Sequence, residues 1–233
     1  MHRPGFAAMV VVTCVVSPVA AVAQDPNLVD QGRYDITVDG QIAGTETFAI
    51  RRQGEGYMAV GRIQLEGERN WLRSAEFGLR TDGDFAPVRF ETRALGRPAQ
   101  TLILTRSGTR LRITTSSEEG DRMTEMLAAP NQVLLGTGIA QHYYFVIRRL
   151  AADGDHPQEL GAILPGDRQE RPIRLVSVTT AEITIGDAVH PAHRYELDVG
   201  TTRHIVWADP ADGRILKVQI PDLQWTSVRR PGS

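Results

Sequence analysis

Residues 194–199 (Arg-Tyr-Glu-Leu-Asp-Val), 203–208 (Arg-His-Ile-Val-Trp-Ala) and 214–220 (Arg-Ile-Leu-Lys-Val-Gln-Ile) decide the fold. In the first and last of these segments apolar side chains alternate with charged or polar ones, which is the period-2 pattern of half-buried β-strands. The connection at 209–213, Asp-Pro-Ala-Asp-Gly, combines a proline-fixed φ, a side-chain acceptor and a glycine free to adopt positive φ. It therefore predicts a hairpin turn between the last two strands.

The same alternation occupies most of the chain before residue 128, and it returns after residue 157. Asp39-Gly40 is a strong two-residue hairpin signal, and further turn signals recur roughly every 8–12 residues. Later strands are expected at 158–164, 172–180, 181–186 and 222–230. A sheet with this many strands twists, and the twist makes it curl or close.

One segment has a helical period instead. Tyr143, Val146, Ile147 and Leu150 share one face of a helix predicted near residues 139–151. The fold class predicted is mainly all-β: a strongly curved antiparallel sheet or open β-barrel, with one helix packed on or in its concave face.

The N-terminus is expected to be removed. Residues 1–23 have an early arginine, an apolar run and the small-x-small sequence Ala-Val-Ala, which together predict a secretory signal peptide cleaved after Ala23. Residues 24–233 then form a single domain, periplasmic or secreted. The chain's one cysteine, Cys14, leaves with the signal peptide, so the core must be sufficient without disulfides.

Composition excludes several partners. The net charge of −2 disfavours nucleic acid. No apolar run after the signal peptide approaches the about 20 residues of a membrane helix, and a monomer is expected. No phosphate loop or dinucleotide motif is present, so no cofactor is predicted.

Three histidines and two aspartates are candidate metal ligands. His190 and His193 lie three apart and His204 follows, but Pro191 opposes a helix that would place the first two on one face, and no cysteine accompanies them. A polar turn explains them better than zinc. Asp209 and Asp212 lack a calcium-loop pattern and fit a hairpin turn.

Glu46 is unusual because its strand neighbours on the same face, including Ile42, Phe48 and Ile50, are mostly apolar. It could be a buried acid with a raised pKa, pair with Arg73, or lie where the sheet edge meets water. An alternative hypothesis is therefore a hydrolase that uses Glu46 or the His190/His193/His204 group. No motif supports a catalytic assignment.

Aromatic and aliphatic side chains form the other candidate site. They are either ordinary core or the wall of a ligand cavity, and residues 133–138 (Val-Leu-Leu-Gly-Thr-Gly) have the composition of a movable gate beside the helix. The ligand-binding candidates are Trp71, Phe77, Phe90, Leu134, Tyr143 and Val146.

Several short motifs occur together along the chain: Gly40-x3-Gly44-x-Glu46, the Gln-His-Tyr-Tyr at 141–144, and Trp-Ala-Asp at 207–209 before the Gly213-Arg-x-Leu-Lys hairpin. In these the sequence resembles a family of secreted Gram-negative β proteins of unknown function, similar in outline to the LolA/LolB lipoprotein carriers. That resemblance implies an incomplete β-barrel holding acyl chains under a helical lid, and it implies no catalytic residue.

The function expected is a periplasmic, non-enzymatic binder of an apolar ligand (a lipid, acyl chain or glycolipid), or an envelope-assembly factor with a solid core. The cavity volume distinguishes the two, because a close-packed interior has no room for a ligand.

Overall fold

The computed structural model describes residues 25–66, 74–95, 100–152 and 159–232. These form one 15-stranded sheet, one α-helix and one 3-10 turn. The order of strands across the sheet is β8-β7-β6-β5-β4-β3-β2-β1-β15-β14-β13-β12-β11-β10-β9. The elements are β1 Leu28–Val38, β2 Gln41–Gln53, β3 Gly56–Leu65, β4 Ala75–Thr81, β5 Pro87–Ala94, β6 Gln100–Ser107, β7 Arg110–Ser117, β8 Gly120–Leu127, β9 Gln132–Leu134, α1 His142–Ala152, β10 Leu160–Leu164, β11 Gln169–Ile185, β12 Ala188–Val199, β13 Thr202–Ala208, β14 Ile215–Ile220, η1 Pro221–Leu223 and β15 Trp225–Arg229.

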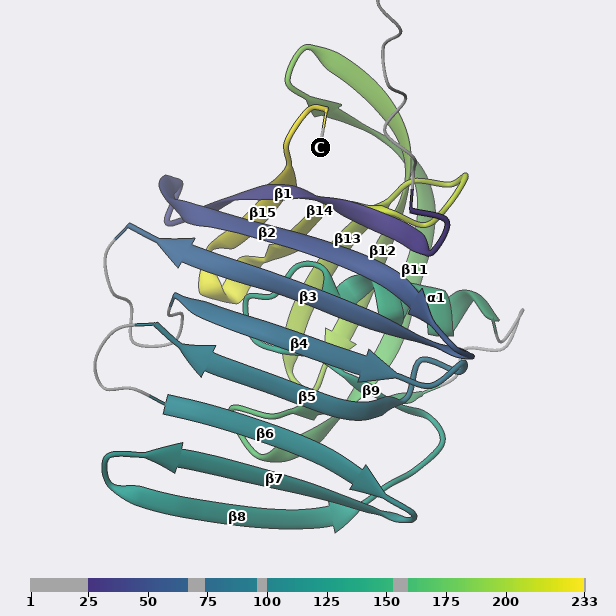
Figure 1. Ribbon diagram of the computed structural model, residues 1–233. Helices are drawn as coiled ribbons and strands as arrows, with labels where there is room; N and C mark the ends of the chain where they lie inside the picture. The colour runs from purple at the N-terminus through teal and green to yellow at the C-terminus, as the bar shows by residue number, and fades with distance from the viewer. Residues whose placement is uncertain (1–24, 67–73, 96–99, 153–158, 233) are drawn as a thin grey trace, which may run out of the picture.

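Sheet topology follows from the hairpins. From β1 to β8 and from β10 to β15, strands that follow one another in sequence pair antiparallel, and β1 also pairs antiparallel with β15, so the first and last strands meet in the middle of the sheet. The exception is β9, which pairs parallel with β10 because α1 connects them. In Figure 1 the sheet curls, with β1–β8 in front and β11–β14 behind. The order is linear, with β8 and β9 at its two ends, so the sheet is curved but unclosed, and the predicted fold class is confirmed.

The described residues contain one α-helix, α1, enclosed by the curved sheet. His142 to Ile147 and Leu150 are buried. Ring contacts bind the helix to the sheet: Phe145 lies 6.3 Å from both Tyr57 and Phe85, centroid to centroid. The helix begins at His142 rather than near residue 139. The N–H of Ile139 donates to the carbonyl of Gly136, and those of Ala140 and Gln141 donate to the carboxylate of Glu46 on β2, so these residues form a turn before the helix.

Three strand boundaries differ from those expected. Residues 172–180 and 181–186 belong to one long strand, β11, which with β12 forms a hairpin that projects beyond the rest of the sheet (Figure 1). The final segment 222–230 contains the end of η1 before β15. The three-residue strand β9 was not expected, since the segment was interpreted as a gate.

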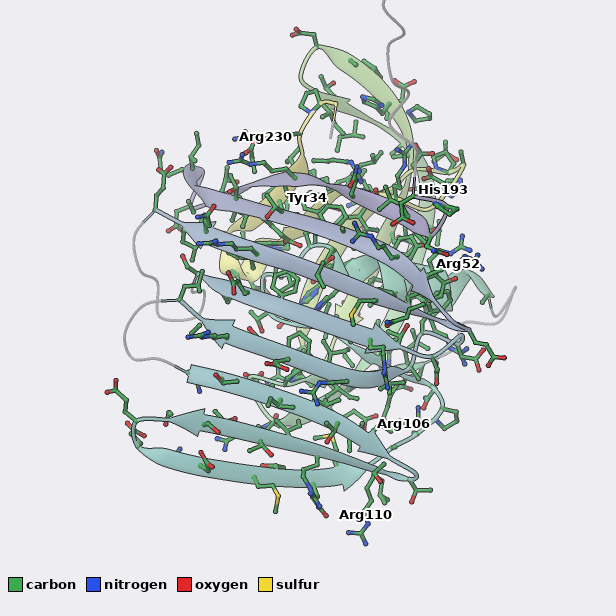
Figure 2. The ribbon with its side chains drawn as sticks, viewed as in Figure 1. Tyr34, Arg52, Arg106, Arg110, His193 and Arg230 are labelled. Carbon is green, nitrogen blue, oxygen red and sulfur yellow. The ribbon has the colours of Figure 1, made fainter. Side chains whose placement is uncertain are left out.

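Ion pairs cover the free edge at β8. Glu125 of β8 accepts hydrogen bonds from Arg110 and Arg112 of β7 at 2.9–3.0 Å. Figure 2 shows Arg110 pointing away from the sheet at this edge. Charged side chains on an edge strand oppose its pairing with other chains. No helix in the described part of the chain is both long and apolar enough to cross a membrane.

Candidate functional site

The curved sheet and α1 form a cavity of about 750 Å³ that opens to solvent. One wall is formed by residues of β3–β8, and the other by residues of β10–β14 and η1. The segment 135–139 and Tyr143 of α1 line its inner side. The cavity therefore lies where the two halves of the sheet face each other without pairing.

The inner surface of the cavity is apolar. Several large apolar side chains that line it are at most 7% exposed, so they belong to the hydrophobic core as well as to the cavity. They include Ile63, Phe90, Leu102, Leu135, Ile139 and Ile220. An apolar molecule in the cavity would replace solvent along this surface, which is favourable by roughly 25 cal/mol per Å² of apolar area removed from water.

The opening of the cavity is charged. Arg122 pairs with Glu119 at 3.2 Å, and Arg171 pairs with Asp167 at 3.4 Å. The remaining charged residues of the rim are Arg168 and Asp222. The cavity is thus amphipathic, with an apolar interior and a rim that carries both signs of charge.

Two polar side chains meet on the apolar wall. The hydroxyl of Tyr143 on α1 lies 2.6 Å from Nδ1 of His204 on β13. Tyr143 is 1% exposed and His204 is 7% exposed. Burial lowers the pKa of His204 to about 4, although Asp222 and Asp198 act in the opposite direction. Burial also raises the pKa of the Tyr143 phenol. Both groups are therefore neutral at neutral pH.

Glu46 of β2 caps the turn before α1. Its two carboxylate oxygens accept hydrogen bonds from the backbone N–H groups of Ala140 (2.7 Å) and Gln141 (3.1 Å). These amides precede the first helical turn and have no intrahelical acceptor, and the positive end of the helix dipole favours an anion there. Glu46 is fully buried, and this desolvation raises its pKa to about 7 despite the two backbone hydrogen bonds.

The segment before α1 is held at several points. The N–H of Leu135 donates to the carbonyl of Ile163, and the N–H of Gly136 donates to Nδ1 of His142 at 2.9 Å. A Cβ on Gly136 would lie 2.6 Å from Cδ1 of Ile139 and 3.2 Å from the ring of His142, so the segment packs closely against both side chains. Within the segment 132–140 only Thr137 is exposed, and it lies on the cavity wall. These contacts hold the segment that was predicted to act as a gate.

No family model matches the chain, and no curated protein matches it. Among solved structures, the chain is similar to the crystal structure of a beta-barrel-like protein of Domain of Unknown Function DUF1849 from Brucella abortus. The TM-score is 0.50 at 9% sequence identity, over 86% of this chain and 94% of that chain. At this identity the likeness is one of fold: a β-barrel-like protein of unknown function. The resemblance to LolA and LolB stays a prediction.

The structure divides the predicted ligand-binding residues into two groups. Phe90 and Tyr143 line the cavity. Phe77, Leu134 and Val146 are buried in the packed core, at 5%, 1% and 0% exposure, and are not on the cavity wall. Trp71 lies outside the described residues, as does Arg73, the suggested partner of Glu46. Whether Phe90 or Tyr143 contacts a ligand stays a prediction.

The histidines named in the hydrolase alternative are not brought together. His204 faces Leu197 across the β12–β13 ladder, whereas His193 faces Ala208 and His190 pairs with Ile183 of β11. The described residues contain no group of three metal-binding side chains. Glu46 is not on the cavity wall, and both of its oxygens are occupied by amides. Of these residues only His204 lines the cavity, so neither candidate places a set of catalytic side chains there.

The aspartates of the β13–β14 connection act as turn residues. Oδ1 of Asp209 accepts from the N–H of Ala211, and Oδ1 of Asp212 accepts from the N–H of Arg214. Arg214 also pairs with both carboxylates. The hairpin interpretation of this stretch is confirmed.

The Tyr143–His204 pair was not predicted, although His204 was considered as a metal ligand. The available signal was its position: His204 alternates with Val206 and Ala208, which are both buried. A histidine on the apolar face of a strand requires a buried partner. The sequence does not indicate that the partner is a tyrosine 61 residues away.

Proposed function

We propose that the protein binds an apolar or amphipathic molecule (a lipid, an acyl chain or a glycolipid) in this cavity, without chemical transformation of it. The observation that carries the proposal is the cavity of about 750 Å³ lined by buried apolar side chains. Ligand sites in proteins typically occupy about 300–1,000 Å³. A charged rim around an apolar interior suits a molecule with one apolar and one polar end.

The alternative of an assembly factor with a solid core receives less support, because close-packed interiors leave few voids larger than a water molecule. The proposal also places the protein in the periplasm or outside the cell, on the sequence features of residues 1–23. N-terminal sequencing of protein recovered from the periplasmic fraction tests this point, with Gln24 expected as the first residue. Recovery of an intact Met1 from the cytoplasm would contradict it.

Binding is tested by filling the cavity. Thr92 of β5 lines the cavity, and its neighbour Arg93 is exposed on the other face of the same strand. We expect Thr92→Trp to weaken the binding of a fluorescent fatty acid by roughly tenfold or more, equivalent to about 1.4 kcal/mol. The matched variant Arg93→Trp adds the same side chain outside the cavity and leaves binding unchanged.

Native mass spectrometry of the purified protein provides a second measurement, in which an adduct of lipid size is expected with the wild-type chain and Arg93→Trp but not with Thr92→Trp. If the wild-type protein carries no adduct and binds no fatty-acid probe, or if Thr92→Trp binds as well as Arg93→Trp, the proposal fails.

A further inference from the structure

The Tyr143–His204 pair places a polar group of defined character among the large apolar side chains of the cavity wall. His204 lies on β13 and Tyr143 on α1, and both line the cavity. Their side chains are joined by the 2.6 Å contact between the phenolic oxygen and Nδ1. The direction of this hydrogen bond determines whether Nε2, the other ring nitrogen of His204, is a hydrogen-bond donor or an acceptor.

The phenol is the donor. Among the described residues, no other acceptor lies within hydrogen-bond distance of the Tyr143 hydroxyl. A buried hydroxyl proton without an acceptor is unfavourable, so it points to Nδ1. A neutral imidazole has one protonated and one unprotonated nitrogen. If Nδ1 accepts, the proton of the ring must be on Nε2.

Nε2 of His204 is available to a ligand. It has no partner among the described residues, and unlike Nε2 of His142 it is not one of the fully buried atoms. The ring is 7% exposed, and the cavity is the space that it borders. Thr202 and Asp222 also line the cavity and carry acceptor oxygens, and the charge of Asp222 acts on the His204 ring, but neither residue forms a hydrogen bond with it.

We infer that His204 recognises its ligand through a single Nε2–H donor, held in that tautomer by Tyr143, and that the ligand has a neutral carbonyl oxygen attached to its apolar chain, as in an acyl ester or amide. Its lowered pKa keeps the ring neutral, so it offers a directed donor rather than a positive charge. This inference rests on the proposed function, since it names the chemistry recognised within the same cavity.

The test compares two ligands and two proteins. The ligands are a saturated hydrocarbon and an acyl methyl ester of matched chain length. The proteins are the wild type and the double variant Tyr143→Phe/His204→Phe, which removes both members of the buried pair and so leaves no polar group unpaired. We expect hydrocarbon binding to be equal in both proteins, and ester binding to be about 3- to 10-fold weaker in the double variant.

A spectroscopic measurement checks the tautomer without any ligand. In the ¹⁵N spectrum of histidine-labelled protein, the ring of His204 should show a protonated Nε2 and an unprotonated Nδ1, and Tyr143→Phe should remove this preference. An Nδ1-protonated ring in the wild type would overturn the inference.

The binding outcomes separate this inference from the proposed function. If both proteins bind the hydrocarbon and the ester with the same ratio of affinities, the cavity binds ligands but His204 does not select them, and the inference is wrong. If the wild type binds neither probe, the proposed function fails and the inference fails with it. The double variant should have the same unfolding midpoint in urea as the wild type, which shows that it is folded. A second variant, His204→Asn, keeps both a hydrogen-bond acceptor and a donor at this position and should retain most of the ester preference.

Discussion

The carboxylate of Glu46 lies 2.7 Å from the backbone nitrogen of Ala140, although 94 residues separate them in the sequence. This contact joins the middle of β2 to the start of α1 and so fixes the helix inside the curved sheet. A buried carboxylate is costly unless it is well paired, and here its partners are amides that would otherwise lack acceptors. The Glu46 carboxylate is therefore one of the contacts that position the helix and, with it, the inner side of the cavity.

The first prediction concerns the pH dependence that Glu46 contributes. Its pKa in the folded protein is about 7, against an ordinary value of 4.5. Between these values the folded protein retains a proton that the unfolded chain has released, so stability falls as the pH rises. Relative to Glu46→Gln, which resembles the protonated acid, the free energy of unfolding of the wild type should fall by about 3 kcal/mol from pH 4.5 to pH about 8.

Urea unfolding at a series of pH values measures this difference. Glu91→Gln, on the exposed outer face of β5, is the matched control for the loss of one carboxylate and should give a curve parallel to that of the wild type. A Glu46→Gln curve that is also parallel to the wild type over this range would contradict the prediction.

Side-chain alternation and turn motifs in the sequence were sufficient to predict most of the strands and hairpins. The alternation of Tyr195, Leu197 and Val199 and the Asp-Pro-Ala-Asp-Gly turn correspond to β12 and the β13–β14 hairpin. Strand β9 was missed because it has three residues, too few for alternation to be recognised. The start of α1 was misplaced because apolar periodicity extends to Ile139, while the backbone there is held by a distant residue.

The candidate site was predictable only in part, because alternation identifies the inward face of a strand but not what that face contacts. Phe77 and Phe90 both point inward and both contact His142, with ring centroids 5.7 and 5.6 Å away, yet only Phe90 lines the cavity. The cavity arises from the curvature of the whole sheet, since it lies between strands that do not pair. No local sequence pattern specifies that separation.

The second prediction concerns the junction of the first and last strands. Arg229 of β15 forms two hydrogen bonds to Asp30 of β1, at 2.8 and 3.0 Å, and a third to the carbonyl of Gln31. Both side chains are almost fully buried. Arg229→Met would leave the Asp30 carboxylate buried without its partner, so a loss of about 3–5 kcal/mol in the free energy of unfolding is expected.

The neighbouring pair Arg230–Asp35 joins the same part of the sheet at 2.6 Å, but both side chains are more than 40% exposed. Arg230→Met is therefore the control, and its cost in urea unfolding should be about 0.2–1 kcal/mol. The double variant Asp30→Leu/Arg229→Met removes the uncompensated charge and should recover most of the loss. Equal losses for Arg229→Met and Arg230→Met would show that burial of the first pair has no energetic consequence.

The third prediction compares two glycines on paired strands. A Cβ on Gly61 of β3 would lie 2.6 Å from the ring of Phe77 and 2.7 Å from the carbonyl oxygen of Thr47. A Cβ on Gly78 of β4 would meet its nearest atom at 4.0 Å.

Gly61→Ala should therefore destabilise the protein by about 1–3 kcal/mol through overpacking. Gly78→Ala should be neutral or stabilising by up to about 1 kcal/mol, because it restricts only the unfolded chain. Thermal melts of the two variants measure the difference, and a lower midpoint for Gly78→Ala than for Gly61→Ala would be the wrong order.

The last prediction concerns acid sensitivity, to which His142 contributes in the opposite direction from Glu46. Burial lowers the pKa of His142 to about 3, from an ordinary value of 6.5. Below pH 6.5 the unfolded chain binds a proton that the folded protein excludes, so stability is lost as the pH falls. Over about two pH units below that value the loss is about 3 kcal/mol.

His142→Asn keeps an acceptor for the N–H of Gly136 but cannot be protonated in this range, so the free energy of unfolding of this variant should lack the pH dependence that His142 contributes. The pKa of His204 is also lowered, to about 4, so among these three buried groups His142 and His204 favour unfolding in acid while Glu46 opposes it. The wild type should therefore lose stability from pH 6.5 downward with a net uptake of about one proton on unfolding. If His142→Asn and the wild type lose stability in parallel, His142 is not the buried neutral group that its environment indicates.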